Sequence, residues 1–153
     1  MTTHALLAPF AAIVLASFPV SLPAQNTDAA PPRVVPSEKL ESWWVIANTS
    51  LEADVPNLGR NVGVPGCATV SFVVEPDGRT STIKLQRVEP EGDLGQVARS
   101  VASNLHFIPT GFNAARARVF SWLIFPFNLP ADKAAASAVM QRCHMADITW
   151  KDH

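Results

Sequence analysis

The sequence predicts a single exported α+β domain, in which one helix packs on a three-stranded antiparallel sheet in the order β-β-α-β. Three patterns indicate this fold: two alternating stretches joined by a Pro-Asp-Gly turn, an amphipathic helix over 94–105, and a long apolar strand over 117–128. A further helix is expected on each side of this core. A chain of 153 residues has room for one domain.

The N-terminus has the composition of a signal peptide over residues 1–24. Residues 5–22 contain no charged side chain and are followed by the small-residue end Pro23-Ala24-Gln25. Pro9 and Pro19 interrupt the apolar run, whereas a spanning helix needs about 20 apolar residues in succession. The sequence therefore favours a cleaved signal, and a retained membrane anchor is the alternative.

Residues 25–36 are polar and proline-rich, which predicts a flexible tether before a domain over 37–153. Ser37 stands where a helix N-cap is expected, and apolar residues follow it at the spacing of one helix face. These residues are Leu40, Trp43, Trp44, Ala47 and Leu51. We expect the two tryptophans to pack on the domain core; a surface for a partner is the alternative interpretation. Glycines and prolines over 54–66 then predict a loop.

The centre of the domain is predicted to be a hairpin followed by a helix. Residues 68–74 alternate as a half-buried strand does, residues 75–78 favour a type I turn, and residues 80–88 resume the alternation. Asp93 and Gln96 occupy the N-cap and N3 positions of a capping box before the helical pattern. Phe107-Ile108-Pro109 is expected to end that helix.

The last predicted strand, over 117–128, is apolar on both faces, and such a strand is either buried centrally or exposes a sticky surface. A helix over 131–145, with Ala135, Val139 and Met140 facing inward, would cover its second face. Cys67 and Cys143 can form at most one disulfide, and two separate buried thiols are the alternative.

Composition and motifs argue against a nucleic-acid partner and against an enzyme. The formal net charge is -1, and the 12 basic residues form no stripe. The sequence has no phosphate loop, nucleophile elbow or His-Glu-x-x-His motif, so we expect no catalysis, no cofactor and no metal. A redox or metal protein that uses Cys67 and Cys143, with His144 and Asp147 nearby, is the weakest alternative.

The order of these elements resembles the TonB C-terminal domain family over the core at 55–129. Val55-Pro56 stands where that family has Tyr-Pro, and Gly63, Gly66, Phe72, Asp77, Gly78, Phe107 and Pro109 match in order. The resemblance implies a periplasmic domain that pairs an extended peptide of an envelope protein or outer-membrane receptor along its last strand. It implies the following binding residues: Ala117, Arg118, Val119, Phe120, Ser121, Trp122, Leu123, Ile124 and Phe125.

Two features depart from members of that family that transmit energy. Residues 5–22 contain no histidine, and the tether reaches only ~40 Å when fully extended. We therefore expect binding without energy transduction, and an anchored transducer component is the alternative. An unpaired strand edge can also pair with the same edge of a second copy of the chain, so a homodimer is a further expectation.

Overall fold

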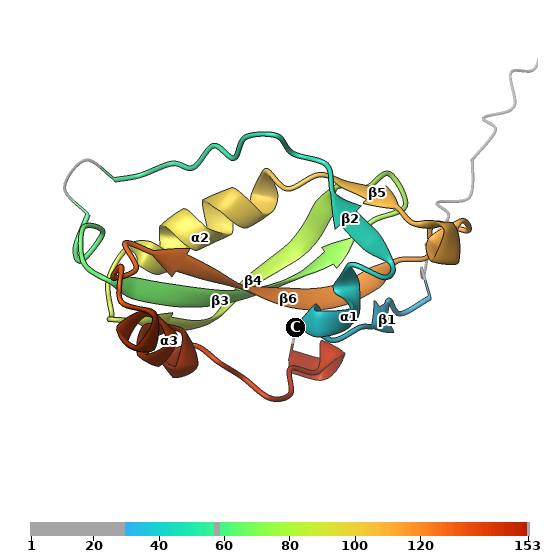
Figure 1. Cartoon of the computed structure of the whole chain (residues 1–153). Helices are drawn as coiled ribbons and strands as arrows, with labels where there is room; N and C mark the ends of the chain where they lie inside the picture. The colour runs from blue at the N-terminus through green and yellow to red at the C-terminus, as the bar shows by residue number, and fades with distance from the viewer. Residues whose placement is uncertain (1–29, 57–58, 153) are drawn as a thin grey trace, which may run out of the picture.

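The computed structural model describes residues 30–56 and 59–152 (Figure 1). The predicted signal peptide and the first part of the predicted tether lie outside the described residues. Within the described part, no helix is long and apolar enough to cross a membrane. The elements follow in the order β1 (Arg33–Val34), α1 (Ser37–Leu40), β2 (Trp44–Ile46), β3 (Gly66–Val74), β4 (Thr80–Glu89), α2 (Leu94–Ser103), β5 (Phe107–Pro109), η1 (Gly111–Asn113), β6 (Val119–Phe127), α3 (Lys133–Arg142) and η2 (Trp150–Asp152).

The class is α+β as predicted, but the main sheet has four strands, in the order β1-β6-β3-β4. β3 pairs antiparallel with β4 and with β6. The prediction of three strands is wrong because the end of the predicted tether adds a short parallel strand, which places Arg33 opposite Val119 and Val34 opposite Phe120. Val35 follows with only 4% of its surface exposed, so burial of this side chain holds the segment on the sheet.

The β3–β4 hairpin forms where the sequence predicts it. The Gly78 N–H donates to the Glu75 carbonyl at 2.8 Å, and Gly78 has a φ of 85°, which is costly for residues with a Cβ. A Cβ at this position would also collide with the Phe107 carbonyl oxygen. Glycine is therefore required at the turn for two independent reasons.

The helix α2 lies across β3 and β4, and its predicted apolar face is buried at Leu94, Val97, Ala98 and Ala102. The predicted capping box is wrong. Asp93 is the N-cap residue, but its carboxylate accepts a hydrogen bond from the Arg60 N–H at 2.7 Å and makes no side-chain cap. A tertiary contact with the loop before β3 has replaced the local one.

The N-terminal helix is much shorter than predicted. α1 ends at Leu40, and Ser37 provides no cap because Pro36 is the N-cap residue. Trp44 instead begins β2, which pairs antiparallel with β5 in a second, two-stranded sheet. The Trp44 indole is 1% exposed and donates to the Ala117 carbonyl at 3.3 Å, whereas Leu51 is 50% exposed. Neither strand was predicted: β2 forms where the first helix was expected to continue, and β5 forms at residues 107–109, where only the end of the second helix was expected.

Helices cover both faces of the sheet (Figure 1). Ala98 and Ala102 of α2 pack on Ala68 and Val70 of β3, while Val139 and Cys143 pack on Cys67 on the opposite face. β3 is therefore buried along its whole length, and the prediction of a half-buried strand is wrong. The predicted C-terminal helix does cover the second face, with Val139 buried and Met140 partly buried, although Ala135 is exposed.

Candidate functional site: the outer edge of β6

The predicted binding residues lie on β6 and immediately before it. Ala117 and Arg118 precede the strand, and the remaining seven occupy its first seven positions. Val119, Phe120, Ser121 and Trp122 are buried, whereas Leu123, Ile124 and Phe125 are half-buried. The second half of β6 is thus the more accessible part.

The side of β6 that faces away from β3 presents backbone groups at every second residue. The carbonyls of Arg118 and Phe120 point to this side, where they accept hydrogen bonds from the N–H groups of Arg33 at 3.0 Å and Val35 at 2.9 Å. The alternation of a strand turns the N–H and C=O groups of Trp122 and Ile124 the same way. The register of β1 ends at Phe120, so no described strand pairs with Trp122 or Ile124 on this side.

Pro126 is the next outward position, and proline has no N–H to donate. An incoming strand would therefore lose its pairing at this point. The open edge of β6 has defined limits, β1 at one end and Pro126 at the other.

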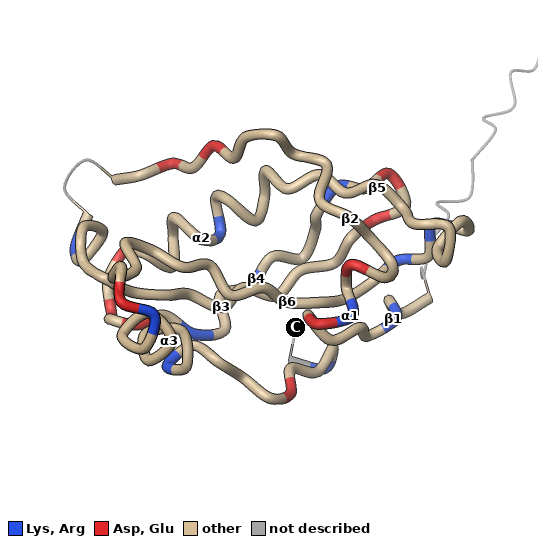
Figure 2. Tube along the Cα trace, in the orientation of Figure 1, with Lys and Arg blue, Asp and Glu red and all other residues tan. Residues whose placement is uncertain are grey.

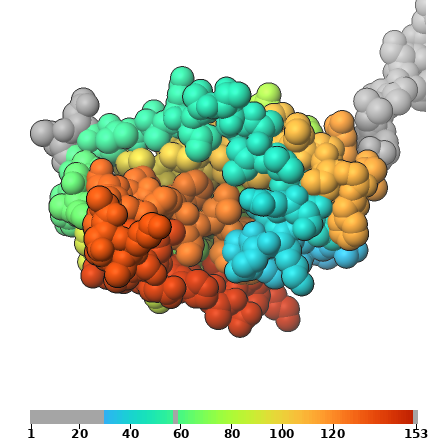
Figure 3. Space-filling view, viewed as in Figure 1, coloured from blue at the N-terminus to red at the C-terminus, as the bar shows by residue number. Residues whose placement is uncertain are grey.

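An apolar groove of about 460 Å³ lies beside this edge. The groove is lined by residues of α1, the turn after it, β2, β5 and β6, namely Ser37, Leu40, Glu41, Trp44, Val45, Ile46, Phe107 and Leu123. Val45 and Ile46 at its rim are each 43% exposed. In Figure 3 the orange surface of β6 adjoins the blue-green surface of α1 and β2, and in Figure 2 neither β2 nor β6 carries a charged residue. The groove is thus suited to an apolar side chain.

The opposite edge of the sheet, formed by β4, is irregular. Register shifts interrupt its pairing with β3, and Thr82 has a φ of 50°. Lys84 and Arg87 add charges along the strand. Bulges and charges are the features with which proteins prevent strand addition.

Arg118, at the start of the candidate edge, ties three segments together. Its guanidinium donates to both carboxylate oxygens of Glu75, at 2.7 and 2.9 Å, and to the Ala30 carbonyl at 3.3 Å. The hydrogen bonds from Arg118, opposed by partial burial and supported by Ser81, hold the pKa of Glu75 below its ordinary value. The hairpin turn, β6 and the N-terminal segment therefore meet at one side chain.

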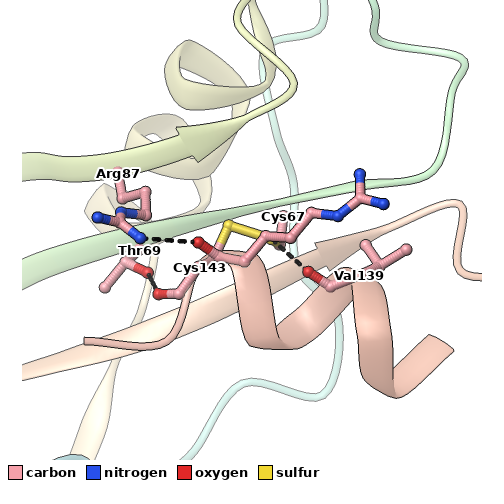
Figure 4. The surroundings of a disulfide bond; sticks show 6 residues. Cys67, Thr69, Arg87, Val139 and Cys143 are labelled. Carbon is pink, nitrogen blue, oxygen red and sulfur yellow. Dashed lines mark hydrogen bonds between the residues drawn. A yellow bond between two sulfur atoms is a disulfide. The ribbon is translucent and has the colours of Figure 1, made fainter. Parts of the chain in front are cut away.

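Cys67 of β3 and Cys143 at the end of α3 form a disulfide (Figure 4), which confirms the predicted pairing. Around it, Thr69 Oγ1 donates to the Cys143 carbonyl and Arg87 Nη1 donates to the Arg142 carbonyl at 3.0 Å. These contacts fix the C-terminal segment on the second face of the sheet.

The redox or metal alternative uses these two cysteines, and the structure places both in one buried disulfide. Both are 0% exposed and bonded to each other, whereas thiol exchange needs an attacking thiolate to reach a sulfur. Among the described residues, no group of three His, Cys, Asp or Glu side chains is placed to hold a metal ion. His144 and Asp147, named above with the cysteines, are both exposed.

Sequence reasoning missed the groove except for Leu123, the one lining residue among the predicted binding residues. Val45 and Ile46 lie within the helix that the sequence predicts after Ser37. The residues of β1 lie within the predicted tether. A run of three β-branched or aromatic residues at 44–46 was the one signal available for β2.

No protein-family model matches this chain, and no curated protein matches it. Among solved structures, the solution NMR structure of the Pseudomonas aeruginosa TonB C-terminal domain aligns with 20% identity and a TM-score of 0.42. The alignment covers 60% of this chain and 92% of that domain.

Proposed function

We propose that this chain is a non-catalytic protein-binding module that accepts an extended segment of another protein at the outer edge of β6. The observation that carries the proposal is the outward backbone of Trp122 and Ile124, with which no described strand pairs, beside a largely apolar groove. Strand addition gains affinity from main-chain hydrogen bonds and specificity from pockets that receive alternate side chains. The edge supplies the first of these and the groove supplies the second.

The residues that line the groove indicate how a guest strand would be recognised. Leu123 lines the groove and lies between the outward backbone positions Trp122 and Ile124. A guest strand paired at those two positions would place a side chain next to Leu123, on the same face of the sheet. Leu40 and Trp44 surround that place, and Glu41 is the one charged residue among the described residues of the groove lining, so an aliphatic or aromatic residue fits best.

We further propose that the module works in the periplasm, on an envelope protein or the peptide of an outer-membrane receptor. The signal-like composition of residues 1–24 supports export. The Cys67–Cys143 bridge supports an oxidising compartment. The retained anchor and the transducer role concern residues outside the described part of the chain, and intact-mass measurement of the exported protein distinguishes them from a cleaved signal.

Photo-crosslinking tests the proposed edge. A photoreactive residue is placed at Val45, on the groove rim, or at Val64, a matched control that is 40% exposed and outside the groove lining. In an envelope extract we expect Val45 alone to capture a protein, and the captured segment, once synthesised, should shift the backbone amide signals of Trp122 and Ile124. Equal capture at both positions, capture of a second copy of this chain, or shifts confined to β4 would contradict the proposal.

A variant pair provides an independent measurement. Leu123→Lys places a charge in the groove, whereas Leu129→Lys changes a leucine that is 38% exposed and lies outside β6 and the groove lining. We expect the first variant to weaken binding of the captured segment by at least about tenfold, since an ammonium group beside an apolar guest side chain loses part of its hydration, and the second to leave it unchanged.

A further inference from the structure

We infer that the chain's own segment Ala30–Pro36 is a built-in occupant of the β6 edge, which a guest must displace before it can bind along the full strand. The inference rests on the proposed function, because it concerns the same edge. It adds a regulatory step: the fraction of molecules with this segment released sets the apparent affinity for a guest.

The segment already makes the contacts that a guest strand would make. The N–H groups of Arg33 and Val35 donate to the carbonyls of Arg118 and Phe120. Val35 is buried in the same cluster as Leu40 and Trp44, two residues that also line the groove. Backbone pairing and an anchored apolar side chain are thus supplied from within the molecule.

Two side-chain contacts also hold the segment, in addition to its backbone pairing with β6. The Arg118 guanidinium donates to the Ala30 carbonyl at 3.3 Å, and the Arg33 guanidinium lies 4.9 Å from the centre of the Trp43 ring. Cation–π contacts at exposed sites are weak, and Arg33 is exposed. The segment is therefore held at several points, each of modest strength.

The available length of the edge makes this segment and a full guest mutually exclusive. Beyond Phe120, only Trp122 and Ile124 have outward N–H groups before Pro126 ends the edge, and no described strand pairs with them. Strands in proteins are typically about five or six residues long. A guest of that length needs the carbonyls of Arg118 and Phe120, which Arg33 and Val35 now occupy.

The sequence of the segment limits the length over which its backbone can pair with β6. Pro31 and Pro32 precede β1 and Pro36 follows it, so none of these positions has an N–H for the sheet. Val34 lies between the two inward donors and is 47% exposed. An occupant that cannot lengthen its pairing is one that a longer strand can replace.

A pair of proline substitutions in the exported protein tests the inference. Arg33→Pro removes an N–H that donates to β6, whereas Val34→Pro removes one that points away, so the second is a matched control. The probe is a synthetic peptide of residues 30–37, whose binding is measured by titration alongside amide hydrogen exchange at Val35. We expect faster exchange at Val35 and about tenfold tighter peptide binding in Arg33→Pro than in the natural sequence, and no change in Val34→Pro.

Each other outcome has a distinct meaning. If the peptide binds the natural sequence as tightly as Arg33→Pro while Val35 stays protected, the edge accepts a guest but the displacement step is wrong. If Val35 exchanges freely in Arg33→Pro and the peptide still does not bind, strand addition at this edge fails and the proposed function fails with it. Val35→Asn, with Val34→Asn as its control, repeats the comparison through the buried side chain. Protection of the segment in both test variants would also overturn the inference.

Discussion

The Arg118 guanidinium and the Glu75 carboxylate form a two-point ion pair, Nε to Oε2 at 2.7 Å and Nη2 to Oε1 at 2.9 Å. The pair joins the turn of the β3–β4 hairpin to the residue that precedes β6. Both side chains keep about a quarter of their surface exposed, 26% and 27%, so solvent weakens the pair without removing it.

This pair predicts a loss of stability in acid. The pKa of Glu75 is depressed in the folded state, so its contribution is complete above the unfolded-state pKa and is lost as the pH falls through the folded-state value. Glu75→Gln should lower the free energy of unfolding by about 1 kcal/mol at pH 7 and remove this part of the acid dependence. Urea denaturation from pH 7 down to pH 3 measures both effects.

The control for this prediction is Asp77→Asn. The Asp77–Arg79 pair is long, at 3.9 Å, and its side chains are 63% and 80% exposed. We expect this change to leave the pH dependence of stability as it is. An equal effect of the two substitutions would show that hairpin charge in general, and not the Glu75–Arg118 geometry, governs the acid response.

Removal of the disulfide is predicted to destabilise the whole domain and to loosen the C-terminal segment first. Replacing Cys67 and Cys143 together by alanine opens a loop with a sequence separation of 76 and should lower the free energy of unfolding by roughly 2 to 4 kcal/mol. Chemical denaturation gives the total, and amide exchange over α3 shows where opening begins. Because both sulfurs are buried, alkylation of the folded natural protein under mild reduction should label neither; rapid labelling would contradict that burial.

Gly78→Ala is predicted to disrupt the hairpin. The positive φ and the collision with the Phe107 carbonyl should together lower the free energy of unfolding by roughly 2 to 4 kcal/mol. Gly111→Ala is the matched control, since a Cβ there meets nothing within 4 Å. Thermal denaturation of the two variants checks the contrast, and similar midpoints would mean that the turn relaxes without strain.

Two buried hydroxyls on opposite faces of the sheet should respond in opposite directions. Ser121 Oγ is buried with no hydrogen-bond partner in the described part of the chain, so Ser121→Ala should be neutral or should stabilise the protein by up to about 1 kcal/mol. Thr69→Val removes the hydrogen bond to the Cys143 carbonyl and should destabilise by about 1 to 2 kcal/mol. A loss of stability in both variants would indicate that Ser121 has a partner after all.

The sequence predicts the parts of this fold whose signals are local. The turn at Gly78, the helix α2 and the existence of strands β3, β4 and β6 all follow from neighbouring residues. β2 does not, because the spacing of Leu40, Trp43 and Trp44 also fits a helix, and it is the indole bond to Ala117 and the pairing with β5 that favour a strand. Propensity is a weak guide where tertiary contacts compete with it.

The candidate edge was predicted from resemblance, and proline chemistry predicts its end at Pro126, but its boundary at β1 was not predictable. β1 consists of two residues between prolines and carries no periodic pattern, so its place depends entirely on the carbonyls of Arg118 and Phe120 and on the pocket for Val35. The prediction of a capping box at Asp93 was wrong for a related reason. The Asp93 carboxylate accepts a hydrogen bond from the Arg60 N–H, which belongs to a loop distant in the sequence. Short segments and long-range polar contacts are the features that a single sequence conceals.

The pairing of β6 with β3 also determines how the molecule would respond to a mechanical load. Each of the nine residues of β3 has a partner on β6, and the strands run antiparallel along their whole length. A tension applied along the axis of β6 would act on all of these hydrogen bonds in parallel, in shear, so they would not break one at a time from an end. With the disulfide anchoring β3 to α3, such a tension would pass into the middle of the domain, away from its exposed margins.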